Sequence, residues 1–242
     1  YAEIGLMASL YSIVLLYALK GGVLVPVFTG NHLRATGRGD QAPFLPPLEF
    51  AAIVAVVAMA AADLADAPPR WRATAALLAF AVHAVRLARW QGWKVRDAPL
   101  LWTIHAGYAW MVLAFLLLGL SDLGVESAGR AWLHAFTVGA LGSMMLGLMT
   151  RVALRHTGRP LVLPSAIVAA YLLIQVAAVT RVAGAMFGST VLTVTLAGAA
   201  WIAAFAIYLA CFGSMLVSPS LPRVTVNPLA GDVQPRRREA SR

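Results

Sequence analysis

Histidine is the side chain in this sequence best suited to cofactor chemistry, and two copies lie inside apolar runs. His83 and His105 are separated by a short polar segment, residues 91–99. If the two runs form antiparallel neighbouring helices, both imidazoles lie roughly 8–10 Å from the same membrane face. Imidazoles at such depth usually face a bundle interior, where they can ligate iron. They could be the two axial ligands of one haem, or two histidines satisfied by hydrogen bonds between packed helices.

The remaining histidines lie near the ends of predicted helices. His134 begins a long run that His156 ends, and a helix of that length spans about 33 Å, so the two cannot share a metal ion. His134 would serve an outer-leaflet site or simply lie at the membrane interface. His156 would be a ligand or a cation at a helix C-terminus, where the helix dipole favours it. His32 fits a solvated loop, although it is predicted at the same membrane face as His156.

The turn RHTGRP, residues 155–160, is a candidate anion site. Gly158 permits a turn with exposed backbone N–H groups, which together with Arg155 and Arg159 could hold a haem propionate. Basic residues that anchor a helix at the cytoplasmic face explain the arginines equally well. Three methionines in the preceding run could ligate copper(I) or fill gaps in packing. They are Met144, Met145 and Met149.

Apolar runs must position these residues, and the composition indicates a membrane. The chain of 242 residues is 60% hydrophobic and only 12% charged, about half the charged share of a soluble domain. We therefore expect an all-α polytopic membrane protein, a bundle of about seven transmembrane helices. The predicted helices cover residues 4–28, 48–64, 73–90, 100–120, 132–154, 161–180 and 190–217. Residues 218–242 are rich in Pro and Arg, which is typical of a solvated, disordered tail.

The basic residues predict how the helices are oriented in the membrane. Fourteen Lys and Arg side chains lie in the segments on one side of the seven helices, against four on the other side. Cytoplasmic segments carry the basic excess, so the C-terminal tail is predicted to be cytoplasmic and Tyr1 external. A start on the external side without a signal peptide indicates earlier helices of the same protein. The net charge of +9 then follows from topology and does not indicate nucleic-acid binding.

The run from residue 132 to 154 also carries a face of small residues. Gly139, Ser143 and Gly147 recur every four residues, a spacing that lets a neighbouring helix backbone approach closely in a membrane. Candidate acids for proton transfer inside the membrane are scarce. Five acidic residues lie at predicted helix ends or in loops: Asp63, Asp66, Asp97, Asp122 and Glu126. The sequence therefore predicts no carboxylate relay across the bilayer.

Four segments together resemble a known family. HAFTVGALGSMMLGLMTRVALRHTGRPL, residues 134–161, resembles the hallmark stretch of NnrS proteins, bacterial membrane proteins linked to nitric oxide metabolism. Three further segments fit the same family, in the family's order. They are GGVLVPVFTGNHLR (residues 21–34), HAVRLARWQGW (residues 83–93) and PLLWTIHAGYAW (residues 99–110).

The resemblance implies an inner-membrane protein of about twelve helices that binds haem and copper and protects against nitrosative stress. The seven helices would be its C-terminal part. The family's characteristic histidines would map onto His83, His105, His134 and His156, without a division between iron and copper. Nitric oxide would be a ligand, exchanged or reduced at iron. Val23 replaces a basic residue usual in the family, and Arg155 replaces a glycine, which would alter turn geometry rather than ligation.

Two other classes of function remain open on the sequence. A small-solute transporter with histidines lining its path would show internal repeats and broken helices. Gly21, Gly22 and Pro26 form one candidate break, and no repeat is visible across the seven runs. A structural or assembly subunit, favoured by the small-residue face, would be colourless and would not depend on its histidines.

Overall fold

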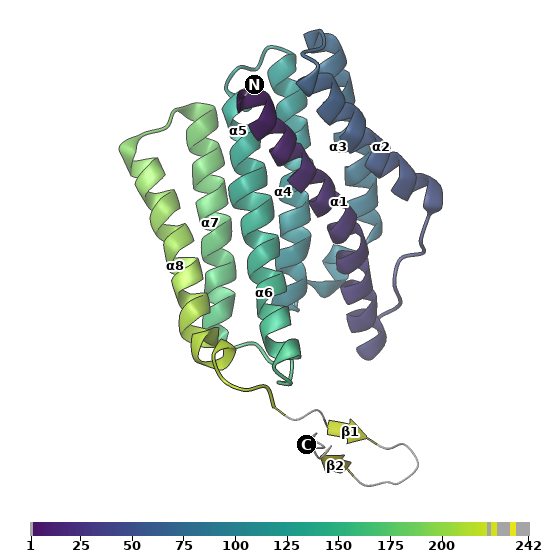
Figure 1. The fold of residues 1–242 in the computed structure, drawn as a ribbon, viewed down its shortest axis with the longest axis vertical. Coiled ribbons are helices and arrows are strands. Elements are labelled where there is room, and N and C mark those ends of the chain that lie inside the picture. The colour runs from purple at the N-terminus through teal and green to yellow at the C-terminus, as the bar shows by residue number, and fades with distance from the viewer. Residues whose placement is uncertain (1, 222–223, 227–232, 236–242) are drawn as a thin grey trace, which may run out of the picture.

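The computed structural model describes residues 2–221, 224–226 and 233–235, and it is a bundle of long helices (Figure 1). The first four are α1 (Ala2–Ala35), α2 (Pro46–Leu64), α3 (Pro69–Arg89) and α4 (Pro99–Asp122), with a 3-10 turn, η1 (Gly92–Val95), before α4. One continuous helix follows, made of α5 (Ala128–His134), the π-helix η2 (Ala135–Leu141) and α6 (Gly142–His156). The last two are α7 (Ser165–Phe187) and α8 (Val191–Leu216). The predicted all-helical bundle is confirmed with seven long helices, and six of the seven predicted transmembrane helices qualify as spans by length and hydropathy.

Six of the seven helices are long and apolar enough to cross a membrane, so the protein is a multi-pass membrane protein. The exception is α3, whose hydropathy is lowered by four arginines and a histidine. Its 21 residues nevertheless span about 31 Å, and it packs along both α2 and α4. The apolar helices α2 and α4 therefore pack on both sides of the arginine-containing helix α3.

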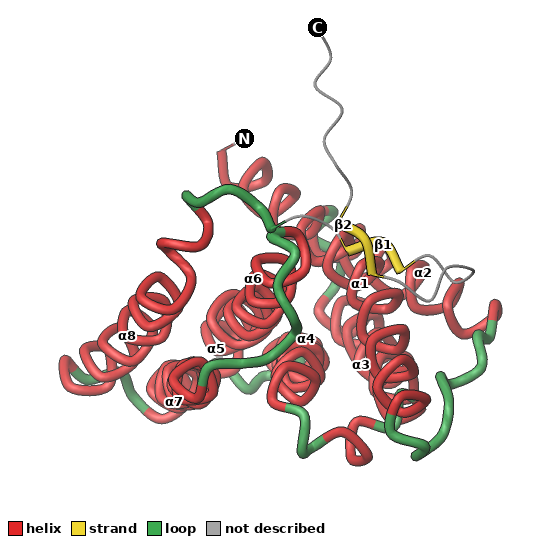
Figure 2. Tube along the Cα trace, turned by 90° about the horizontal axis from the view of Figure 1, so that it is seen from below, coloured by secondary structure: helices red, strands yellow, loops and turns green. Residues whose placement is uncertain are grey.

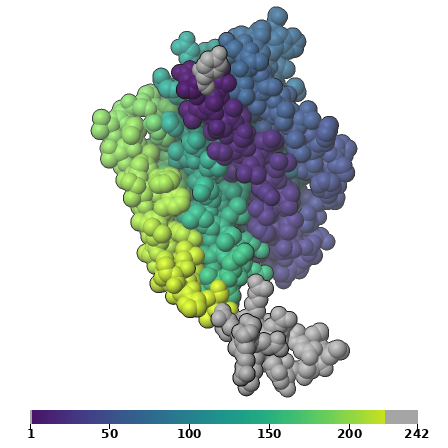
Figure 3. Space-filling view, in the orientation of Figure 1, coloured from purple at the N-terminus to yellow at the C-terminus, as the bar shows by residue number. Residues whose placement is uncertain are grey.

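The helices lie side by side from α8 at one edge to α2 at the other (Figures 1 and 2). α4 is the central helix, with 67% of its most apolar window buried. α1, purple in Figure 3, runs obliquely across one face and contacts α2, α4 and η1. Residues from α1 to α4 thus meet at the lower end of the bundle.

Several elements differ from their predicted bounds. α1 continues to Ala35 through Gly21, Gly22 and Pro26, so the predicted break is wrong; a membrane helix tolerates Pro because neighbouring groups satisfy the freed backbone. α2, α3 and α4 each begin with proline, which lacks the N–H that a helix start leaves unpaired. In the tail predicted to be disordered, β1 (Val224–Val226) and β2 (Val233–Pro235) form an antiparallel pair. Tail residues 222–223, 227–232 and 236–242 lie outside the described residues.

The small-residue face of the helix made by η2 and α6 packs closely against α4, as predicted. A Cβ added to Gly147 would lie 2.8 Å from Ile104, and one added to Gly139 would lie 2.5 Å from the ring of Trp110. From the other side, a Cβ on Gly107 of α4 would lie 3.2 Å from the carbonyl oxygen of Ala140. The two backbones are close enough that larger side chains do not fit between them.

Candidate functional site

A buried arginine, Arg86 of α3, is the centre of a polar cluster that joins four helices. Its side chain is only 5% exposed, and its Nη2 pairs with the carboxylate of Glu49 at the start of α2. Its Nη1 donates hydrogen bonds to the carbonyl oxygen of Ala18 in α1 (2.9 Å) and to the hydroxyl of Tyr108 in α4 (2.8 Å). The guanidinium lies against Gly22, where a side chain would collide with it. These five residues form what we call the Arg86 cluster.

His83, one turn before Arg86, is fully buried and uses both ring nitrogens. Nε2 lies 3.1 Å from the carbonyl oxygen of Ala52, which can only accept, so Nε2 carries the hydrogen in a neutral ring. Nδ1 then accepts from the hydroxyl of Tyr108 at 2.7 Å, and that hydroxyl accepts in turn from Arg86. Freeing Nδ1 of His83 for a metal ion would therefore leave the buried hydroxyl of Tyr108 without an acceptor.

His105 of α4 is also buried, but only one of its nitrogens is used. Nε2 lies 2.8 Å from the hydroxyl of Thr29 in α1. Nδ1 has no hydrogen-bond partner among the described residues, and it faces the backbone of Gly92, where an added Cβ would lie 2.7 Å away. Its ring packs edge-on against Trp90, which in turn contacts the ring of Tyr108 with centroids 4.5 Å apart. The two buried histidines are thus connected through an aromatic pair.

A cavity of about 250 Å³ opens beside the Arg86 cluster. It is enclosed by α1, α2, α3 and the connection between α1 and α2, and its lining includes Pro26, Leu48, Glu49, Arg86 and Trp90. Glu49 and Arg86 therefore line a cavity large enough for a small molecule. His83 is not part of the cavity lining.

The other predicted ligands lie apart from this centre. His134 is partly exposed at the end of α5, and His156 is exposed at the end of α6. Of the three methionines, Met144 is buried and Met145 is half exposed, so they do not face one site. Within the described part of the chain, no three His, Cys, Asp or Glu side chains are close enough to hold a metal ion.

The predicted anion-binding turn is closed by the chain itself. Gly158 adopts φ +74°, as a turn requires. The N–H of Gly158 donates to the carbonyl of Arg155 and the N–H of Arg159 to that of Leu154, so both cap α6. A Cβ on Gly158 would lie 2.9 Å from the carbonyl oxygen of Leu221. The expectation of exposed N–H groups is therefore wrong, because the helix end uses them.

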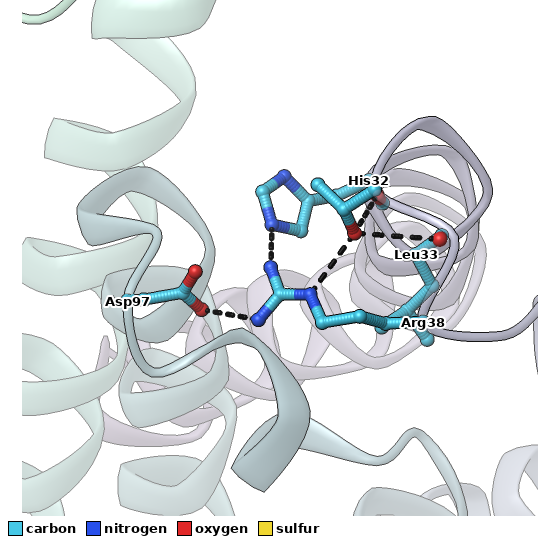
Figure 4. Close-up of polar contacts among 5 residues, drawn as sticks. His32, Leu33, Arg38 and Asp97 are labelled. Atoms are coloured by element: carbon cyan, nitrogen blue, oxygen red, sulfur yellow. Dashed lines mark hydrogen bonds and ion pairs between the residues drawn. The ribbon is translucent and has the colours of Figure 1, made fainter.

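His32 belongs to an exposed cluster at the lower end of the bundle (Figure 4). Nη2 of Arg38 lies 2.6 Å from Nε2 of His32. Nη1 of Arg38 donates a hydrogen bond to the carboxylate of Asp97 at 2.9 Å. The hydrogen bond from Arg38 holds the pKa of Asp97 below its ordinary value. The cluster of His32, Arg38 and Asp97 thus ties the end of α1 to the segment before α4.

The residues that organise the buried site do not stand out in the sequence. By its position Arg86 is one of the basic residues at the predicted cytoplasmic side, but its guanidinium lies inside the bundle. Nothing in the sequence marks Glu49 or Thr29 as a site residue. One signal was available, since Arg86 follows His83 by three positions and thus shares its helix face.

A family model covers nearly all of the helical part of the chain. The model describes the NnrS protein and matches residues 1–220. The chain belongs to the NnrS family. Membership suggests a membrane protein related to nitric oxide. Comparisons with curated proteins and with solved structures gave no match.

Proposed function

We propose that this NnrS protein binds haem in the bacterial inner membrane, with a cytoplasmic C-terminus, and acts in the response to nitric oxide and the protection against nitrosative stress. His105 is the residue we assign to iron. The observation that carries the proposal is a buried imidazole on the central helix whose one hydrogen-bond partner among the described residues is a hydroxyl, that of Thr29. Neutral imidazole is a usual axial ligand of haem iron.

His105 fits this role better than His83. Nδ1 of His105 is enclosed by Gly92, so Nε2 is the nitrogen that could be given to a metal. Its partner, the hydroxyl of Thr29, can turn to a backbone carbonyl of its own helix. Releasing Nδ1 of His83 would instead leave the buried hydroxyl of Tyr108 without its acceptor, so we assign His83 to positioning.

Haem iron, when bound, supplies a site where nitric oxide can exchange as a ligand or accept an electron. The protein's contribution is the surroundings of the imidazole. Trp90 packs edge-on against the His105 ring, and the backbone of Gly92 lies against its Nδ1. Tyr108 fixes Trp90 through their edge-on contact. Together these groups keep water from the ring and hold it in one orientation.

Copper binding is the part of the proposal that rests on the family resemblance alone. His134 and His156 lie at opposite ends of one helix, and the methionines diverge. The described residues therefore do not form a copper site by themselves, and we derive no step through copper. Arg159, whose Nη1 is buried without a partner within the described residues, remains a candidate for a propionate.

The test is a visible absorption spectrum of the full-length protein in detergent, oxidised and reduced, before and after nitric oxide. We expect a haem spectrum that shifts with nitric oxide, is lost in His105→Ala, and persists in His156→Ala, the matched control at an exposed helix end. His83→Ala should retain haem while lowering thermal stability. A colourless protein after expression with ample haem, or a spectrum unchanged in His105→Ala, would contradict the assignment.

A further inference from the structure

A basic pocket lies at the lower end of the bundle, around η1. It is an open hollow of about 560 Å³, lined by Arg38, Trp93, Lys94, Arg96 and Asp97. The charge of Arg38 is matched by Asp97, whereas Lys94 and Arg96 make no ion pair within the described residues. The pocket therefore offers two unmatched positive charges beside an indole that is 63% exposed.

An apolar groove of about 510 Å³ lies next to this pocket. It runs between the end of α1, the start of α4 and the connection from α6 to α7. Its walls include Phe28, Leu100, Leu101, Leu161 and Leu163. Such a surface is suited to hydrocarbon and offers little to a soluble anion.

The cluster of His32, Arg38 and Asp97 is the wall that the two spaces share (Figure 4). His32 lines the groove, and its Nε2 contacts the guanidinium of Arg38, which lines the pocket. Asp97 lines the pocket, and Ala98, the next residue, lines the groove. A ligand that fills both spaces must be anionic at one end and apolar at the other.

We propose that this paired site binds an anionic phospholipid, with its phosphate at Lys94 and Arg96 and an acyl chain in the groove. The excess of basic residues favours the cytoplasmic face for this end of the bundle, in line with the topology proposed above, and basic pockets between helices on that side bind anionic head groups. The exposed indole of Trp93 is suited to the same interface. The site is separate from the haem ligand and stands whether or not the protein binds haem.

Lipid titration of the full-length protein in neutral detergent tests the head-group contacts. Phosphatidylglycerol should raise the melting temperature, whereas phosphatidylcholine and inorganic phosphate should not. Lys94→Gln with Arg96→Gln should weaken phosphatidylglycerol binding roughly 25-fold, since each basic side chain near the surface contributes about fivefold. Arg70→Gln with Arg130→Gln is the control, because it removes the same charge from exposed arginines at the other end of the bundle.

Two tryptophan substitutions test the acyl chain. Leu163→Trp should fill the groove and weaken binding, whereas Val162→Trp, at an exposed neighbour outside the groove, should not. Equal binding of phosphatidylcholine, or equal loss in the Lys94/Arg96 and Arg70/Arg130 double variants, would overturn the proposal. So would full competition by inorganic phosphate, which indicates a free-anion site, or no binding of phosphatidylglycerol at all.

Discussion

Gly22→Ala is the substitution that tests the Arg86 cluster most directly. The added Cβ would lie 1.7 Å from Nη2 and 2.2 Å from Cζ of Arg86, so the guanidinium has to move away from Glu49. Breaking a buried ion pair costs about 3–5 kcal/mol, while glycine to alanine inside a helix returns about 1 kcal/mol. The free energy of unfolding should therefore fall by about 2–4 kcal/mol. For a chain of this length that lowers Tm by roughly 4–16 °C.

The assay is thermal unfolding in detergent, followed by far-UV circular dichroism. Gly198→Ala is the matched control, since Gly198 is also inside a helix and has nothing within 4 Å of an added Cβ; its Tm should hold or rise. In an Arg86→Met background, Gly22→Ala should cost less than about 1 kcal/mol, because the two effects are coupled through one contact. Equal Tm values for the Gly22 and Gly198 variants would refute the reasoning.

Three further outcomes can be measured in the same preparation. Gln175→Leu removes a side chain that accepts a hydrogen bond from Trp110 and donates one to Ser143, so Tm should fall by an amount equivalent to about 1–3 kcal/mol; Gln175→Glu keeps the acceptor but loses the donor and adds a charge inside the membrane, so its Tm should fall as well. Gly139→Ala pushes a methyl group into the Trp110 ring and should cost about 1–3 kcal/mol as overpacking, while Gly198→Ala costs nothing. Asp97→Asn should lower Tm at neutral pH, because the pKa of Asp97 is depressed in the folded state; the difference should disappear as the pH falls below about 4, through the folded-state pKa. A difference that survives at about pH 2 would contradict the role of Arg38.

The helices could be predicted because each depends on residues that are adjacent in the sequence. Apolar runs longer than a bilayer requires mark the spans, and prolines at residues 46, 69 and 99 mark three helix starts. The π-helix could not be foreseen, because Ala135–Leu141 is as apolar as the helical turns around it. Its wider turns pack against α4 and α7. Such contacts between distant segments cannot be predicted from the local sequence.

The site was predicted only in part, for a related reason. Burial of His83 and His105 followed from their place in apolar runs. Their partners did not, because Ala52, Tyr108 and Thr29 lie between 25 and 76 positions away. The two histidines are equivalent by residue type, but they differ in which ring nitrogens are free to bind a metal ion. That difference decides which of them can ligate iron, and it emerges only from the tertiary contacts.

The pairing of Glu49 with Arg86 has a consequence for biosynthesis. α2 and α3 are consecutive and connected by a short turn, so they can leave the ribosome and enter the lipid as one hairpin. An unpaired arginine costs about 2.5–3.5 kcal/mol at the middle of a membrane helix, and less near a helix end, where Arg86 lies. Glu49 precedes Arg86 in the chain, so the carboxylate is already synthesised when the arginine enters the lipid. We therefore expect α3, the least apolar of the long helices, to insert more readily together with α2 than alone.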